Sequence, residues 1–340
     1  MQKHRDTFIS KGLLYPAVLG DQGHVKLTTY ALKPGGDDIL HRLHGINDRD
    51  TLKYFRESLV TDLQKEIDNC KPRILLLSNE HCSSRLTSIN EIENIKTLLL
   101  TFSSQIRIVI YLRRQDECLV SSYSTAIKSG HSYRISHPSA EEMELRYNYQ
   151  NIISRWAGVF GRANIIVRIF SKGGDFNLVE DFLRVVHDPN YLIADHQNMY
   201  VNRSLDVKSI ELLRRINFYL PLYESGHLTP FRDNIGELLE RISGSHPPYR
   251  ADPELLSNFM SKFHKSNLSV AEDYIGHVFE HGDPLFGDNL SRSEPTADGK
   301  DITVDEVIEM VSRVWKEKVA ETVHLRKMLA DCIEKCAKEK

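Results

Sequence analysis

The sequence predicts an α/β fold in which helices cover a parallel sheet, followed by a helical C-terminal region. Short apolar runs alternate with amphipathic helical segments, which is the pattern of strands joined by helical crossovers. The runs over 73–77 and 106–112 are nearly all apolar, as expected of strands that are covered on both faces. Beyond residue 200 no further run of this kind occurs, and only helical periodicity continues.

The first half is predicted to run helix, helix, strand, helix, strand, with bounds 3–11, 51–69, 73–77, 89–102 and 106–112. Gly12 ends the first helix, and Asp50 is the expected N-cap of the second. The strand over 106–112 is the strongest in the chain because it is rich in β-branched residues.

The second half opens with a helix over 115–128 that ends at Gly130. Ser139 and Glu142 have the spacing of a capping box and open a helix expected to reach Trp156. A third strand is predicted over 164–169. The remaining helices are expected near 176–187, 205–217, 233–243, 253–265 and 268–279.

We expect three regions: an α/β domain over 1–281, a linker over 282–301 and a C-terminal helix over 302–340. Within the domain, the strands fall in 1–190 and residues 200–281 are helical. Thr303 and Glu306 cap the last helix, whose apolar residues alternate with charges of both signs. Packing on the domain or on a second copy is the favoured interpretation, and docking to a partner or a membrane surface is the alternative.

Composition excludes several classes of protein. The chain has 340 residues, 41% hydrophobic and 27% charged, which suffices for a core and argues against global disorder. Lys and Arg number 44 against 47 Asp and Glu, a net charge of −3, so a nucleic-acid partner is not expected, although a local basic pocket for a small anion is allowed.

Targeting and redox signals are few. No run of eighteen apolar residues occurs and the N-terminus lacks a signal-peptide core, so we expect no membrane span and a cytoplasmic location. The five cysteines are scattered except for Cys332 and Cys336, which favours reduced thiols, and no ligand cluster predicts a metal site.

Chemistry is expected where the strand over 106–112 ends. Arg113 and Arg114 follow it, and the next helix carries Ser121, eight residues after Arg113. Open α/β sheets bind ligands at this edge, and an arginine with a hydroxyl suits one phosphate group. The alternative for Arg113 is an ordinary surface ion pair. Arg114 either reinforces the phosphate site or pairs with Glu117.

The strand, the arginine and the serine eight residues later resemble the 3′-phosphate-binding motif of sulfotransferases that use 3′-phosphoadenosine 5′-phosphosulfate (PAPS). Residues 72–81 stand where those enzymes have a strand that ends near the catalytic base. The segments 147–149, 155–156, 160–161 and 164–169 look like bacterial sulfotransferase-like proteins associated with surface polysaccharides. The resemblance covers most of residues 1–280 and implies an α/β fold of the P-loop NTPase type.

The chain departs from that family at one essential part. Members open with a strand, a loop rich in Gly, Lys and Thr, and a helix, and the loop holds the 5′-phosphosulfate. The sequence has no such loop, because Lys172-Gly173-Gly174 follows the third strand and residues 2–16 resemble the end of the helix after the loop. We therefore expect the first strand and loop to be missing. Either the chain is a truncated enzyme, or the protein is a pseudoenzyme or binding module.

The resemblance implies transfer of a sulfuryl group from PAPS to a hydroxyl of a carbohydrate acceptor, without a metal; a non-catalytic binding or assembly protein is the alternative. A P-loop kinase is disfavoured because the phosphate loop is absent. Glu80 is the first choice for the base and His81 its rival, while a helix cap or surface ion pair is the other interpretation of Glu80. Ser78 is expected to position the donor or acceptor. His24 either meets the acceptor sugar or is a solvated loop histidine.

Overall fold

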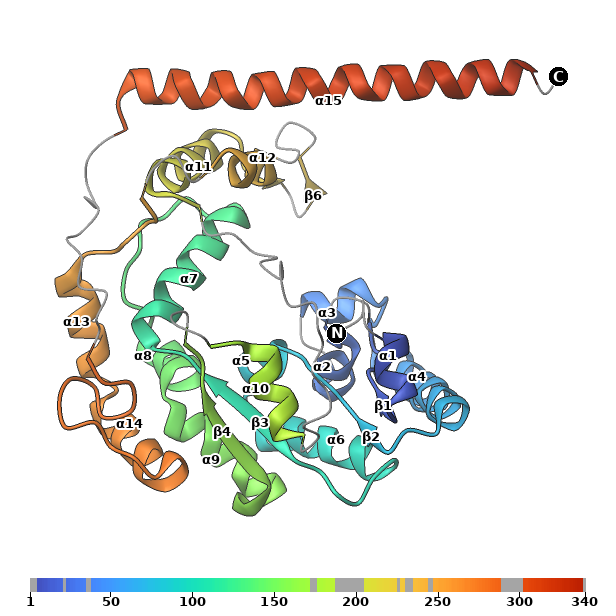
Figure 1. The fold of residues 1–340 in the computed structure, drawn as a ribbon, viewed down its shortest axis with the longest axis vertical. Coiled ribbons are helices and arrows are strands. Elements are labelled where there is room, and N and C mark those ends of the chain that lie inside the picture. Colours follow the sequence, from blue (N-terminus) through green and yellow to red (C-terminus); the bar gives the residue numbers. More distant parts are fainter. Residues whose placement is uncertain are drawn as a thin grey trace. The chain divides into compact units, whose positions relative to one another are not determined.

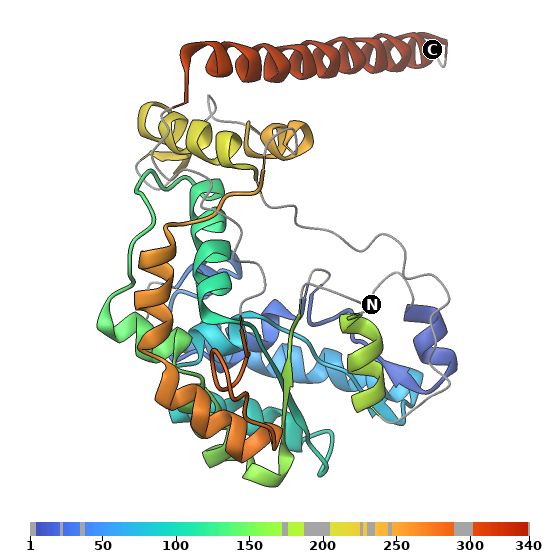
Figure 2. The ribbon, with the colours of Figure 1, turned by 60° about the vertical axis from the view of Figure 1, so that its left-hand side comes forward.

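The chain forms two compact units in the computed structural model (Figures 1 and 2). The described residues are 5–20, 23–34, 38–171, 176–186, 205–224, 227–229, 235–243, 247–288 and 302–338. Unit 1 comprises Met1–Leu112, Pro138–Phe170 and Phe263–Asp288, and unit 2 comprises Arg113–His137, Ser171–Lys262 and Asn289–Lys340. Parallel strands among many helices confirm the predicted α/β class, with a helical C-terminal region.

The strands of unit 1 form two parallel pairs where one continuous sheet was predicted. β3 (Ile108–Leu112) pairs with β4 (Ile165–Ile169) in register from Ile108 opposite Ile165 to Leu112 opposite Ile169. The second pair joins β1 (Leu13–Leu14) to β2 (Ile74–Leu75), which is shorter than the predicted 73–77. Two residues are too few to show periodicity, and for this reason the sequence did not predict β1.

The turn before β1 depends on a glycine. Gly12 has a φ of +76°, a conformation that favours glycine, and its carbonyl accepts the backbone N–H groups of Arg73 at 2.8 Å and Ile74 at 3.1 Å. This contact aligns the start of β1 with the start of β2.

Helices surround these strands within unit 1. They are α1 (Arg5–Ser10), α2 (Val25–Ala31), α3 (Ile39–Leu43), α4 (Arg49–Cys70), α5 (His81–Arg85), α6 (Ile89–Leu100), α8 (Ala140–Glu142), α9 (Tyr149–Phe160) and α14 (His264–Val270). The main core lies where α6 packs against α9 and α9 contacts β3 and β4. Its buried side chains include Ile92, Ile95, Ile153 and Trp156.

One predicted helix start needs correction, and another is confirmed. α4 begins one residue before Asp50, because Asp48 is the N-cap: its carboxylate accepts the N–H of Thr51 at 2.8 Å, and the Thr51 hydroxyl oxygen accepts the N–H of Asp48 at 3.1 Å. Ser139 does accept the N–H of Glu142, at 3.1 Å, as predicted.

The helix that Ser139 opens does not run on to Trp156. A π-helical turn (Met143–Tyr147) interrupts it, and α9 restarts with Asn148 as its own N-cap, which accepts the N–H of Asn151 at 3.2 Å. A further π-helical turn (Ala271–Ile275) follows α14, and a 3₁₀ turn (Arg162–Asn164) precedes β4.

The described residues of unit 2 form helices and one short hairpin, joined by loops. Its helices are α7 (Gln115–Lys128), α10 (Leu178–Val185), α11 (Val207–Tyr219), α12 (Ile235–Ile242), α13 (Pro253–Ser261) and α15 (Val304–Lys338). The hairpin joins β5 (Tyr223–Glu224) to β6 (His227–Leu228) and was not predicted. The predicted bounds of α7 are confirmed. So is the cap of α15, where Thr303 and Glu306 exchange hydrogen bonds of 2.8 and 3.2 Å.

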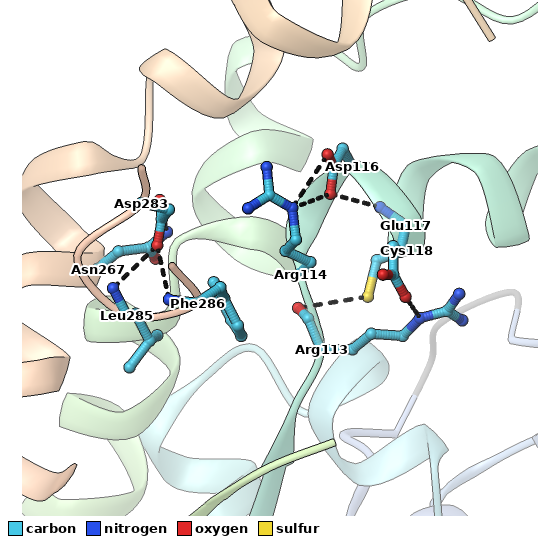
Figure 3. A network of polar contacts seen from close by, with 9 residues as sticks. All are labelled: Arg113, Arg114, Asp116, Glu117, Cys118, Asn267, Asp283, Leu285 and Phe286. Atoms are coloured by element: carbon cyan, nitrogen blue, oxygen red, sulfur yellow. Dashed lines mark hydrogen bonds and ion pairs between the residues drawn. The ribbon is translucent and has the colours of Figure 1, made fainter. Parts of the chain in front are cut away.

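Parts of several predicted segments lie outside the described residues: 2–4, 172–174, 187, 233–234, 289–301 and 339–340. The start of the expected linker is described, and it folds onto α14 in unit 1. There Asn267 donates to the Asp283 carboxylate at 2.9 Å, and the same carboxylate accepts the N–H groups of Leu285 and Phe286 at 3.0 and 3.1 Å (Figure 3). No helix in the described ranges is long and apolar enough to cross a bilayer.

We predict that Ile153→Ala lowers the free energy of unfolding by about 2–5 kcal/mol, because it leaves a cavity in the core that supports β3 and β4. Urea unfolding with an unchanged m-value measures this loss. Leu43→Ala is the control, since Leu43 is exposed and its truncation should change stability by no more than about 0.5 kcal/mol. An equal effect of both variants would contradict the core described above.

Candidate functional site

The expected phosphate site lies at the junction between β3 and α7. β3 ends at Leu112, Arg113 and Arg114 follow, and α7 starts at Gln115, so only two residues separate strand from helix. The first turn of α7 carries Asp116 and Glu117, acids that suit the positive end of the helix dipole. The side chains of Arg113 and Arg114 diverge from this junction (Figure 3).

Arg113 is oriented along α7 by an ion pair. Its Nε donates to Oε2 of Glu117 at 2.8 Å, and both side chains are partly buried. Ser121 lies four residues beyond Glu117, on the same side of the helix. The predicted order of strand, arginine and helix with serine is therefore present, and so is the ion pair that was its alternative. Sequence reasoning had weighed Glu117 only as a partner of Arg114.

Arg114 has a different acidic partner from the one considered. Its Nε donates to both carboxylate oxygens of Asp116, at 3.1 and 3.2 Å, and Oδ1 of Asp116 also accepts the N–H of Glu117 at 2.8 Å. Burial raises the pKa of Asp116, while the charge of Arg114 and these hydrogen bonds oppose the rise. Arg114 thus stabilises a buried carboxylate at the start of α7.

The two candidate bases belong to unit 1, at the start of α5. Glu80 occupies the N-cap position, but its side chain is 90% exposed and makes no capping hydrogen bond. Asn79 provides the local cap instead, since its Oδ1 accepts the N–H of His81 at 2.7 Å. Nε2 of His81 lies 4.0 Å from Oε1 of Glu80. The desolvation on which the choice of Glu80 rested is therefore absent from the structure.

His24 and Ser78 hold each other through the backbone. The N–H of His24 donates to the carbonyl of Ser78 at 2.9 Å, and the N–H of Ser78 donates to Nδ1 of His24 at 3.1 Å. His24 is 0% exposed, so it is not a solvated loop histidine. Ser78 itself is exposed. Because Nδ1 is an acceptor, the neutral ring carries its proton on Nε2, which is buried without a hydrogen-bond partner among the described residues.

The turn after β1 is held by Glu66, a residue that sequence reasoning missed. Its carboxylate accepts the N–H groups of Ala17 at 2.9 Å and Val18 at 3.1 Å, and it pairs with Arg5. The ring of Tyr15, in the same turn, lies 4.0 Å from the ring of His24. No local pattern reveals Glu66, because its partners lie 48 to 61 residues away along the chain. Asn79, just before a helix, carried a readable capping signal.

Burial sets the electrostatics of His24. It lowers the pKa of the imidazole to about 4, and the Pro16 carbonyl and the charge of Glu66 oppose this shift. The ring is thus neutral near pH 7. Within the described ranges, no group of three or more His, Cys, Asp or Glu side chains is placed to hold a metal ion.

The comparisons add one relative of unknown activity. The chain is 32% identical over 199 residues to an uncharacterized protein of Archaeoglobus fulgidus, a match that covers 56% of this chain and 51% of the relative. The chain therefore spans about half the length of that relative. No protein-family model matches the chain, and no solved structure matches it.

We predict that acidification destabilises the fold through His24. The unfolded chain takes up this proton below about pH 6.5 and the folded chain only below about pH 4, so stability is lost as the pH falls between these values. The loss is about 3 kcal/mol at 1.36 kcal/mol per pKa unit. The difference in unfolding free energy between wild type and His24→Asn, measured from pH 7 to pH 4, isolates this contribution.

A matched control separates the effect from general acid unfolding. His264→Asn, in the same unit, replaces an exposed ring and should keep the wild-type pH dependence. Wild type and His24→Asn with parallel pH profiles would contradict the burial of a neutral imidazole.

Proposed function

We propose that this protein binds PAPS through Arg113 and Ser121 and transfers its sulfuryl group to a hydroxyl of a carbohydrate acceptor. One observation carries the proposal. β3 is followed directly by Arg113 and Arg114 and then by α7, and Ser121 lies on the side of α7 where Arg113 pairs with Glu117. This junction stands at the carboxyl end of a parallel strand pair, where α/β proteins bind ligands. It agrees with the sulfotransferase resemblance of the sequence.

The 3′-phosphate has to compete with Glu117 for Arg113. A phosphate carries up to two negative charges and three acceptor oxygens, and a guanidinium binds such a group through paired hydrogen bonds. The Glu117 side chain is 34% exposed, so it can rotate toward the solvent when a phosphate binds Arg113. Exchange of Glu117 for phosphate then leaves the hydroxyl of Ser121 as a second donor on the same side of α7.

The transfer step needs a proton acceptor. The acceptor oxygen bonds to sulfur while the bond from sulfur to the phosphate oxygen breaks, and the hydroxyl proton passes to a base, which we assign to Glu80 or His81. Because Glu80 is exposed, a bound carbohydrate has to cover it before its carboxylate is desolvated. Cationic or N–H donors stabilise the charge that develops on the leaving 5′-phosphate, a role distinct from that of Arg113, which is assigned to the 3′-phosphate.

A nucleotide- or glycan-binding protein without turnover is the second candidate. One observation favours it: the side chain of Glu80 is 90% exposed. Assays for release of 3′-phosphoadenosine 5′-phosphate in the presence of oligosaccharides decide between the two. Release that Glu80→Gln or His81→Asn abolishes supports the enzyme, and nucleotide binding without release supports the binding protein.

We predict that Arg113→Ala weakens binding of 3′-phosphoadenosine 5′-phosphate by roughly 10- to 150-fold, which corresponds to about 1.5–3 kcal/mol for a charged hydrogen bond. Isothermal titration calorimetry measures the dissociation constant. Arg146→Ala is the matched control, because Arg146 also pairs with a glutamate one helical turn away, at 2.9 Å from Glu142. Equal affinities of wild type and Arg113→Ala would overturn the assignment of the phosphate site.

We also predict that Glu117→Gln strengthens binding of the same nucleotide several-fold, because it removes a competing charge from Arg113 and a repulsion from the phosphate. The gain should shrink as salt is added, since salt screens charges that are partly exposed. Glu142→Gln, the partner of the control arginine, should leave the affinity unchanged. Weaker binding by Glu117→Gln would mean that the ion pair serves the site rather than competing with it.

A further inference from the structure

The C-terminal helix α15 is longer than the part of unit 2 that supports it. Its 35 residues span about 52 Å at 1.5 Å per residue. α15 packs on α11 and α12, and Met310, in its first half (residues 304–321), is buried. Ion pairs of Glu306 with Lys208 at 2.8 Å and of Glu317 with Arg241 at 4.0 Å add to this contact. We call this part the anchored half (Figure 1).

An apolar stripe runs along another side of the anchored half. It consists of Val304, Ile308, Val311, Trp315 and Val319, which are 46–74% exposed. Their spacing of three and four residues places all five within an arc of about 80° on the helix. Met310, which is buried, lies well outside that arc. The stripe is therefore an apolar surface that unit 2 leaves uncovered in the described structure.

The C-terminal part of α15 is more exposed than the anchored half. Every residue from Thr322 to Cys332 is exposed, including Val323, Leu325, Met328 and Leu329 at 55–62%. We call this segment the free half. A helical segment of this length is marginal in water on its own, so packing has to stabilise it.

We propose that α15 pairs antiparallel with α15 of a second copy of this chain, so that the free half of each helix covers the apolar stripe of the other. Such a pairing is closed and two-fold, because each copy gives one free half and receives one. With the two-fold axis near Val319, Trp315 of one helix meets Val323 of the other. About four in seven positions of the 35-residue helix, about 20 residues, would face the partner, close to the 20–30 residues a side of stable interfaces.

Charge favours the antiparallel orientation. Residues 304–312 carry Asp305, Glu306 and Glu309 and no cation of their own. Glu306 is paired with Lys208 of unit 2 at 2.8 Å, which leaves Asp305 and Glu309 as the acids near the stripe, the latter 4.0 Å from Arg313. A parallel pair would set these acids beside their own copies. An antiparallel pair brings them toward the segment with Arg326 and Lys327 and also opposes the two helix dipoles. Acidic residues beside the stripe argue against an anionic membrane surface as its partner, since such helices carry a basic polar face.

Sedimentation velocity of the full chain tests the pairing, and the result does not depend on the proposed function. We expect a dimer at micromolar concentration. Val319→Glu should raise its dissociation constant about 100-fold or more, because it buries two facing carboxylates without partners. Ala320→Glu is the control, since it adds the same charge to an exposed position outside the stripe and should leave the dimer intact. Circular dichroism confirms that both variants fold.

Cross-linking tests the orientation. A mixture of Trp315→Cys and Val323→Cys chains should form a disulfide-linked pair on mild oxidation, at a yield above that of either variant alone. Cross-linking of each variant with itself but not with the other would show a parallel pair and overturn the antiparallel proposal. Three results would each overturn the pairing. They are a chain that stays monomeric at about 100 μM, a dimer whose dissociation constant Val319→Glu does not change, and a chain that binds anionic vesicles and does not dimerise.

Discussion

The direct passage of β3 into α7 is the constraint on which the candidate site depends. Pairing with β4 fixes β3 over five residues, and the N–H of Phe170 binds the carbonyl of Leu112 at 2.7 Å, so the strand ends at a defined position. Only Arg113 and Arg114 then remain before the helix. With so short a connection, Arg113 has to start beside the first turn of α7. Its alignment with Glu117 is a consequence of chain geometry as much as of charge.

Buried polar groups serve the strand pair of β1 and β2 in a different way. His24 and Ser78 exchange hydrogen bonds, and the Glu66 carboxylate accepts backbone N–H groups of the turn after β1. These contacts satisfy backbone groups that a two-residue strand cannot satisfy alone. The stabilisation has an electrostatic condition, because His24 must stay neutral. This part of unit 1 is consequently more sensitive to acid than the apolar core around α6 and α9.

Local signals were enough to predict the long helices but not the site. α15 follows from its capping residues and periodicity, and α7 follows from periodicity and from Gly130, which ends it, signals that act within a few positions of the chain. β1 and the π-helical break before Asn148 escape such reasoning because they depend on neighbours far away in sequence. The same holds for chemistry: the spacing of Arg113 and Ser121 was readable, whereas the burial of His24 and the exposure of Glu80 are tertiary properties.

Glu117 makes the proposed phosphate site selective for ligands that carry two negative charges. A ligand with a single negative charge gains little from Arg113, because it replaces a carboxylate that already satisfies the same guanidinium and remains beside the site. A dianionic phosphate gains more, since it offers twice the charge and additional acceptor oxygens. Under the proposed function, the ion pair would therefore discriminate 3′-phosphorylated adenosine nucleotides from those that lack the 3′-phosphate. The ion pair between Arg113 and Glu117 lowers the affinity for every anionic ligand, but it lowers the affinity for weakly charged ligands most, and in this way it would raise specificity.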